Sequence, residues 1–434
     1  MASEIREAES WLEKGDEFLS KKLYDKAIEC YTRSIELNPN QAFGHFKRGN
    51  VLYEKKMLKE AIRDYTNCII LNNNFSFAYF KRGQAFLDAK QLVKAEGDFN
   101  KAIELNDEFY LAYFKRAMTR SYMNKNQDAL SDFAKTIEIK ENYVQAFIQR
   151  GHKYFQMKDY QSAINDYSMA INLDPKESKT YISRGIAYGN QNKFRDALND
   201  YTKAVSLDNQ SVLGFMYRGM IYNRLKEFDK AILDYDQVVK IKSDYEEAYN
   251  YRGIANFATK RYEQSVEDYT KAISYNSKNP SYFYNRANAH FNLKDYIASI
   301  SDYSETVEID PRYSAAYFGR ASANANLSRY KEAIKDFTRA ISLNNKLLQA
   351  YIGRGNAYMK MRYFKKALED YTLAIELDPD NSQAFLNRGI TFREMGENTD
   401  AGDDFNEFLR LVPKSQQSER IRRWLDKEGI LAKY

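Results

Sequence analysis

Apolar, aromatic and small residues recur along this chain with a period of 34 residues, from about Ala8 to Ser415. When Ala8 is counted as repeat position 1, position 4 is aromatic in almost every period, position 8 is glycine or alanine, and position 11 continues the same stripe. Position 20 is alanine or serine, and position 24 is always tyrosine or phenylalanine. Spacings of three and four residues place such positions on one face of a helix. Each period is therefore predicted to contain two amphipathic helices, the second with its buried stripe at positions 20, 24, 27 and 28.

Glycine and proline mark the contacts and the ends of these helices. The small residue at position 8 is expected to let the second helix approach the first closely. Five of the six prolines stand at position 32, where proline stops the second helix before the next period begins. The sixth, Pro280, opens a first helix, a place that tolerates its missing N–H.

The unbroken period predicts one continuous all-α array, because stacked repeats form a single body whose core grows with repeat number. Residues 1–7 are interpreted as a short N-terminal lead. Residues 416–434 are interpreted as a capping helix and tail, in which Ile421, Trp424 and Leu425 share one helical face. Residues 8–415 are expected to form twelve contiguous repeats, with the bounds 8–41, 42–75, 76–109, 110–143, 144–177, 178–211, 212–245, 246–279, 280–313, 314–347, 348–381 and 382–415.

This pattern resembles the motif of the tetratricopeptide repeat family, to which positions 4, 8, 11, 20, 24, 27 and 32 correspond. The resemblance covers nearly the whole chain. It implies a right-handed α-α superhelix, the tetratricopeptide solenoid, in which the first helices of the repeats line a concave groove. It also implies that the groove binds segments of other proteins.

One departure from the common motif is systematic. Position 7, often leucine in the family, is arginine in repeats 2 to 12, and position 23 is aspartate in the same repeats, whereas repeat 1 has Lys14 and Cys30 there. Their joint absence from repeat 1 predicts partly buried ion pairs within single repeats, so that replacing Arg218 by alanine should destabilise the array locally. An arginine ladder that contacts nucleic acid is the alternative, and it leaves the aspartate column unexplained. The structural pairs singled out are Arg218 with Asp234 and Arg252 with Asp268.

Composition adds a few bounds. The formal charge of +6 over 434 residues is too small to argue for wholesale binding to nucleic acid or membranes. The two cysteines, Cys30 and Cys68, fall inside helices and offer neither a disulfide nor a zinc framework. The N-terminal segment is charged, and no stretch approaches the roughly 18 apolar residues of a membrane span. We expect a soluble cytoplasmic protein without membrane insertion; a cytoskeletal or ciliary association is compatible with the array, but no residue selects it.

The sequence contains no recognisable set of catalytic residues. His45, His152 and His290 occupy ordinary repeat positions, without a partner at the spacing of a metal site or of a nucleophile and its base. Neither a paired-cysteine motif nor a GxxxxGK phosphate-binding segment occurs. We therefore expect no enzyme activity, no metal, no cofactor and no small-molecule substrate.

The first helices of repeats 2 to 4 carry a coherent set at positions 2, 5, 6 and 9, which face inward in the family. Aromatic rings beside ammonium groups suit a partner segment that is both apolar and acidic. In the alternative interpretation, the position-5 rings pack against adjacent helices and the lysines form a solvated stripe. The candidate groove residues are Phe43, Phe46, Lys47, Asn50, Phe77, Phe80, Lys81, Gln84, Leu111, Phe114 and Lys115.

A second candidate patch lies in repeats 7 to 9 and has few formal charges. Its asparagines can hydrogen-bond the backbone of an extended peptide in both directions. The residues of this patch are Met216, Tyr217, Asn250, Tyr251, Tyr284, Asn285 and Asn288.

These features favour a non-catalytic scaffold that binds a peptide segment or partner proteins in its groove, for the assembly of a complex. A co-chaperone without the standard carboxylate clamp is one alternative, since the clamp known in the family needs lysine at position 5, which no repeat has. A helical-repeat RNA binder is another; the apolar position 5 and the balanced charge oppose it.

Overall fold

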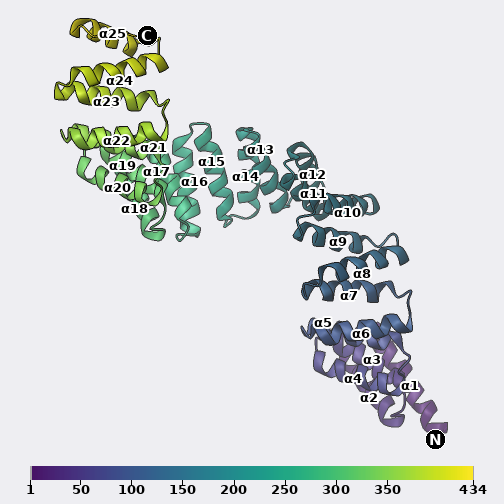
Figure 1. Ribbon diagram of the computed structural model, residues 1–434. Coiled ribbons are helices and arrows are strands. Elements are labelled where there is room, and N and C mark those ends of the chain that lie inside the picture. The colour runs from purple at the N-terminus through teal and green to yellow at the C-terminus, as the bar shows by residue number, and fades with distance from the viewer. Residues whose placement is uncertain (1, 434) are drawn as a thin grey trace. The chain divides into compact units, whose positions relative to one another are not determined.

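The computed structural model describes residues 2–433, and in that range it consists of 25 α-helices without a strand. The chain divides into two compact units, one ending at Gly214 and the other beginning at Phe215. Within each unit the helices follow one another in chain order as stacked pairs (Figure 1). The predicted all-α solenoid is therefore confirmed.

Most helices of the first unit have 13 or 14 residues. They are α1 (Ala2–Ser20), α2 (Tyr24–Leu37), α3 (Ala42–Glu54), α4 (Leu58–Leu71), α5 (Ser76–Asp88), α6 (Leu92–Leu105), α7 (Tyr110–Tyr122), α8 (Asn126–Ile139), α9 (Val144–Gln156), α10 (Tyr160–Leu173), α11 (Ser178–Asn190) and α12 (Phe194–Leu207).

Helix α13 (Val212–Arg224) contains the boundary between the units. The second unit continues with α14 (Phe228–Ile241), α15 (Glu246–Ala258), α16 (Tyr262–Tyr275), α17 (Pro280–Asn292), α18 (Tyr296–Ile309), α19 (Ser314–Asn326), α20 (Tyr330–Leu343), α21 (Leu348–Lys360), α22 (Phe364–Leu377), α23 (Ser382–Met395), α24 (Asn398–Leu411) and α25 (Gln416–Glu428).

The N-terminal end differs from the sequence-based expectation. Helix α1 has 19 residues and begins at Ala2, so the segment expected to be a short lead is already helical from that residue on. Ala8, the first residue of the period, is fully buried within this longer helix. The charged residues before Ala8 carry no apolar periodicity, which is why the pattern alone did not reveal these additional turns.

The first helices of successive repeats end in the same left-handed turn. After α3, Lys56 has a φ of 63°; its N–H donates to the carbonyl of Tyr53, and the N–H of Met57 donates to the carbonyl of Leu52, both at 2.9 Å. This is the Schellman pattern that closes a helix C-terminus. The equivalent residue is not glycine in eleven turns, and in the last it is Gly396, with a φ of 83°. The hydrogen-bonded turn therefore ends these helices even where no glycine is present.

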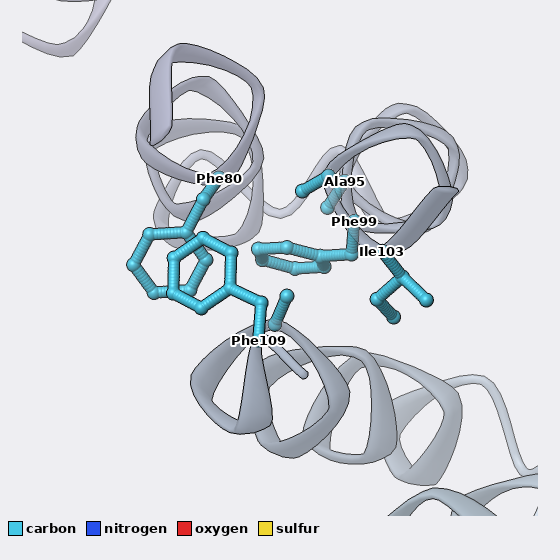
Figure 2. Packing of buried hydrophobic residues seen from close by; sticks show 7 residues of the cluster. Phe80, Ala95, Phe99, Ile103 and Phe109 are labelled. Carbon is cyan, nitrogen blue, oxygen red and sulfur yellow. The ribbon is translucent and has the colours of Figure 1, made fainter. Parts of the chain in front are cut away.

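The core is built from aromatic rings that lie on small residues. A Cβ atom added to Gly83 of α5 would stand 2.8 Å from Cε1 of Phe99, so the absence of a side chain makes room for the ring. Figure 2 shows Phe99 gathered with Phe80 and Phe109 between α5, α6 and the start of α7. Position 8 thus accommodates the position-24 ring of the second helix, which is how the two helices pack so closely.

The C-terminal helix α25 covers the apolar end of the second unit. Ile421 and Leu425 are buried against a cluster that includes Phe405 and Leu409 of α24. The ring of Trp424 meets Phe405 edge-on, with centroids 5.2 Å apart. The face predicted from the three apolar residues of this segment is the face that packs, as a capping helix requires.

Candidate binding site

The arginines of position 7 pair with the aspartates sixteen residues later. In the pair of Arg218 and Asp234, Nε and Nη2 of the guanidinium donate to the two carboxylate oxygens at 2.8 and 2.6 Å. The Arg218 side chain is 17% exposed and the Asp234 side chain 5%. Arg252 and Asp268 form the same kind of contact, with Nη2 2.5 Å from Oδ1. Such two-point pairing fixes the orientation of the guanidinium as well as its charge.

In nine of these arginines, Nη1 of the guanidinium also donates to a side chain of the preceding repeat. Nη1 of Arg252 donates to Asp236 of α14 at 2.6 Å, and Nη1 of Arg286 donates to Thr270 of α16 at 3.0 Å. Each of these arginines therefore connects three helices. Sixteen residues before Arg150 the chain has Ala134, whose side chain has no acceptor atom, and Arg150 makes no such bond. These guanidinium groups serve the internal structure, which opposes the alternative of a nucleic-acid ladder.

Two of the buried aspartates differ in protonation behaviour. Burial raises the pKa of Asp234 above its ordinary value, and the hydrogen bonds from Arg218 offset this only in part. Burial acts in the same sense on Asp64, but hydrogen bonds from Arg48 and from His45 outweigh it and lower the pKa of Asp64. His45 replaces the usual position-4 ring and lies 3.2 Å from Asp64 through Nδ1. At Asp64, the hydrogen bond and charge of His45 added to those of Arg48 thus turn the pKa shift downward.

The predicted groove residues of repeats 2 to 4 separate into a buried and an exposed group. Phe80 and Phe114, at position 5, are buried in the helix-packing cores, and Phe46 is half-buried. Their rings are occupied by contacts within the protein: Phe80, for example, lies 4.8 Å from Phe109 between centroids. We therefore correct the candidate set, because these three rings contribute mainly to the core. Phe43 and Phe77, at position 2, are 50% and 48% exposed.

The exposed rings form part of a continuous aromatic row. Phe43 stacks on Phe75 with centroids 5.4 Å apart, Phe75 lies 6.3 Å from Phe77, and Phe77 lies 4.8 Å from Phe109. We call these four residues the phenylalanine row. Phe75 and Phe109 are not among the residues predicted from the sequence, because they stand at position 34, just before α5 and α7, and outside the helical stripes that the period marks. Leu111, another candidate groove residue, packs against the core cluster that contains Phe99 and Phe109.

The polar groove candidates also differ from one another. Lys47 forms an ion pair with Asp16 of α1. Lys81 and Lys115 have no ion pair among the residues that the structure describes. Asn50 accepts a hydrogen bond from the hydroxyl of Tyr65 at 2.9 Å. The side-chain oxygen of Gln84 is buried and has no hydrogen-bond partner within residues 2–433.

A cavity of about 570 Å³ opens between the α5–α6 turn and α7. Leu87, Leu92 and Met118 contribute apolar surface to its walls, together with the largely buried ring of Phe114. Two ammonium groups, from Lys90 and Lys115, stand at the same cavity, as do Asp88 and Tyr122. The structure thus places Phe114 and Lys115 of the predicted groove beside residues that the sequence analysis did not select.

The second candidate patch is largely engaged in its own contacts. Asn285 donates to Asn250 at 3.0 Å, and Asn288 accepts from the hydroxyl of Tyr303 at 2.6 Å. Met216 is buried. Two of the remaining rings contact other rings: Tyr251 stacks on Tyr235 with centroids 6.1 Å apart, and the centroid of Tyr284 lies 5.0 Å from that of Tyr313. Tyr217 is likewise not free of partners. This patch offers a ligand fewer unused groups than the phenylalanine row.

Two general observations concern metals and membranes. Among residues 2–433, no group of three or more His, Cys, Asp or Glu side chains is arranged to hold a metal ion. In the same range, no helix combines the length and the apolar character that a membrane crossing demands.

Paired helices at a constant spacing, stacked through a repeated ring-on-glycine contact, define a helical-repeat solenoid. Models of the tetratricopeptide repeat match residues 144–177, 182–246, 284–346, 348–381 and 383–415, and a model described as TPR repeat matches 15–56 and 257–294. Together these matches cover more than half of the chain. The chain belongs to the tetratricopeptide repeat family, whose arrays are scaffolds typical of protein–protein interaction.

Solved structures of the same repeat class resemble parts or most of this chain. YrrB, described as a TPR protein with an unusual peptide-binding site, is 21% identical, with a TM-score of 0.39 over 42% of this chain and 95% of its own. The C-terminal part of a TPR protein from Cytophaga hutchinsonii is 21% identical, with a TM-score of 0.49 over 55% and 98%. Yeast Tom70 is 18% identical, with a TM-score of 0.38 over 97% and 95%. No curated protein matches the sequence.

Proposed function

We propose that this protein is a non-catalytic scaffold that binds an apolar and acidic segment of a partner protein along the phenylalanine row. The observation that carries the proposal is the exposure of Phe43 and Phe77 in a row of neighbouring rings. Lys81 follows Phe77 by four residues on α5, and neither Lys81 nor Lys115 has an ion pair among the described residues. Exposed aromatic clusters rimmed by charge are typical of interaction surfaces.

The extent of the array supports a role in bringing partners together. We propose that residues 8–415 act as twelve repeats, since α3, α5 and α7 begin at Ala42, Ser76 and Tyr110, one period apart. An array of this length presents more surface than one short peptide covers. Assembly of a complex in the cytoplasm is the setting we propose for it, with the asparagine patch of the second unit as a further contact.

Site-specific photo-crosslinking tests this function in cells. A benzophenone-bearing residue placed at Phe77 should crosslink to a partner, and sequencing of the crosslinked segment should show large apolar residues interspersed with Asp or Glu. The same group placed at Tyr363, a ring of the second unit with 51% exposure, is the matched control for a photoreactive side chain on an exposed aromatic site.

The rings themselves are tested with the double variant Phe43→Ser and Phe77→Ser. We expect binding of the identified segment to weaken by at least tenfold, because two half-exposed rings lose their contacts with it. Tyr363→Ser should leave the affinity unchanged. The proposal fails if Phe77 and Tyr363 yield the same crosslinks, or if the double variant binds the segment as tightly as the wild type.

A further inference from the structure

The cavity beside α7 is lined by two leucines at positions where three other repeats have a pair of rings. Positions 12 and 17 hold aromatic pairs in repeats 5, 8 and 9, with centroids 5.3–5.4 Å apart, namely Phe155 with Tyr160, Phe257 with Tyr262, and Phe291 with Tyr296. In the third repeat these positions are Leu87 and Leu92, and both line the cavity. The leucine side chains are smaller than such a pair of rings, and the cavity has a volume of about 570 Å³.

The walls of the cavity are apolar and adaptable. Leu87, Leu92 and Phe114 supply aliphatic and aromatic surface, and Met118 adds a flexible thioether that can adjust to different ligand shapes. A volume of this size lies in the range of pockets that bind small ligands, and it exceeds the volume of any single side chain. The cavity is therefore large enough to admit a phenylalanine, tryptophan or leucine side chain from another molecule.

The charged groups at the cavity determine which residues can stand next to that side chain in the partner. Lys90, held in the left-handed turn with a φ of 57°, and Lys115 of α7 have no ion pair among the described residues. The one carboxylate at the cavity, Asp88, already accepts a hydrogen bond from the hydroxyl of Tyr53 at 2.5 Å. Two ammonium groups against one carboxylate leave a net positive charge at the cavity, which attracts an anion and disfavours a further cation.

We infer that this cavity binds a bulky apolar side chain of the partner segment, and that Lys90 and Lys115 bind a carboxylate adjacent to it. The inference rests on the proposed function and adds a recognition element to it: an aromatic or branched aliphatic anchor next to Asp or Glu. It differs from a general apolar patch in requiring both the volume of the cavity and the two ammonium groups.

The test uses the full chain with isotope-labelled methionine methyl groups and three short synthetic peptides. In an otherwise identical Gly-Ser frame, the peptides carry Asp-Phe-Asp, Lys-Phe-Lys or Asp-Ala-Asp. We expect the Met118 methyl signal to shift saturably with the Asp-Phe-Asp peptide, at an affinity at least tenfold higher than with the other two. The signals of Met359 and Met361, in the second unit, serve as internal controls and should not move.

Two variants test the volume and the charge separately. Leu87→Phe combined with Leu92→Tyr rebuilds the pair that Phe291 and Tyr296 form, and is expected to weaken Asp-Phe-Asp binding at least tenfold while preserving the fold, as circular dichroism will show. Lys90→Glu should weaken it by a similar factor without entering the core. Lys56→Glu, at the equivalent left-handed turn one repeat earlier, is the matched control and should have no effect.

The outcomes separate the inference from the proposed function. Equal binding of the three peptides, no saturable shift of Met118, or unchanged binding to the filled or Lys90→Glu variant overturns the inference. If the filled variant does not fold, Lys90→Glu against Lys56→Glu decides. A partner segment that crosslinks at Phe77 and binds the filled variant with unchanged affinity would leave the proposed function standing and remove only the anchor pocket. The absence of specific crosslinks at Phe77 would instead remove the proposed function.

Discussion

The ring of Tyr303 occupies the space that a side chain on Gly319 would need. A Cβ on Gly319 would lie 2.7 Å from Cε1 of Tyr303 and closer still to Cζ. Tyr303 is 2% exposed, and its hydroxyl is held by Asn288 at 2.6 Å, so the ring cannot easily move away. In the repeat of Tyr303, position 8 is Ala287 instead of glycine, and Gly319 stands at position 6 of the next repeat. Gly353 repeats the relationship, its Cβ falling 2.5 Å from Cζ of Phe337.

Replacing Gly319 by alanine should therefore destabilise the second unit. Overpacking of a core contact costs about 1–3 kcal/mol, and a Cβ in steric conflict with both Cε1 and Cζ of the buried Tyr303 ring places Gly319 toward the upper end, above the gain of about 1 kcal/mol that alanine brings to a helix. We expect a lower free energy of unfolding in denaturant titrations and faster hydrogen exchange in α18 and α19. Gly97→Ala is the control, because a Cβ added to Gly97 of α6 would have no neighbouring atom within 4 Å, and this substitution should raise stability. Equal effects of the two substitutions would show that the Tyr303 ring yields without cost.

The ion pairs should be worth far more inside the array than on its surface. Arg252→Ala leaves Asp268 buried, with only the amide of Asn256, 3.0 Å away, as a remaining partner. Removing one member of a buried pair typically costs about 3–5 kcal/mol. Arg261→Ala breaks an exposed pair with Asp229 and should cost less than about 1 kcal/mol. Hydrogen exchange in α15 and α16 measures the loss of stability in both variants. A loss of stability in Arg252→Ala as small as that in Arg261→Ala would contradict the argument.

The recurring positions of the sequence predict the features that every repeat shares. The aromatic residue at position 24 and the small residue at position 8 predict the packing of Phe99 on Gly83, because their spacing places both on facing stripes. The arginine and aspartate columns likewise indicate partners such as Arg218 and Asp234, which the structure brings together. Features that repeat along the chain are visible without coordinates, since each repeat is independent support for the same contact.

Features that belong to single repeats were not predicted. Gly319 and Gly353 stand at position 6, which holds charged, polar or tyrosine residues in the other ten repeats, so the column as a whole does not point to a close ring contact. The cavity is lined by Leu87 and Leu92, which are smaller than the aromatic pairs that repeats 5, 8 and 9 have at these positions, and a division into apolar and polar residues ignores this difference. The burial of Phe80 depends on Phe109, which lies 29 residues further on, in the loop before α7. Such contacts require the three-dimensional arrangement.

The left-handed turns offer a way to stabilise the array. Lys260 has a φ of 63°, a conformation that is strained for a residue with a side chain and relaxed for glycine. We expect Lys260→Gly to raise the free energy of unfolding by about 0.5–1 kcal/mol, and Gly396→Ala to lower it by a similar amount. Lys271→Gly, inside α16, is the control with the opposite sign, because glycine weakens a helix interior by about 1 kcal/mol. A decrease for Lys260→Gly would mean that the lysine side chain contributes a contact that outweighs the backbone strain.

The opposite pKa shifts of Asp64 and Asp234 predict opposite pH dependences. The lowered pKa of Asp64 means that its contribution to stability is present above its unfolded pKa of about 3.9 and is lost as the pH falls below it. The stability difference between the wild type and Asp64→Asn should therefore shrink on acidification from about pH 5 to pH 3. The raised pKa of Asp234 has the reverse consequence: its contribution is full below the unfolded pKa and is lost as the pH rises through the higher, folded value.

The difference between the wild type and Asp234→Asn should accordingly grow on acidification over the same range, and denaturant titrations at several pH values measure both slopes. Each variant is the control for the other, because the asparagine substitution keeps the shape of the side chain and removes a single titrating group. The same comparison can be made in a His45→Phe background, which restores the ring usual at position 4. His45→Phe removes the second hydrogen-bond donor to Asp64 and leaves Arg48 alone to oppose the effect of burial. The pH dependence of the Asp64 contribution should then approach that of Asp234. Slopes of the same sign for both aspartates would show that pairing with arginine, and not the additional histidine, determines their protonation.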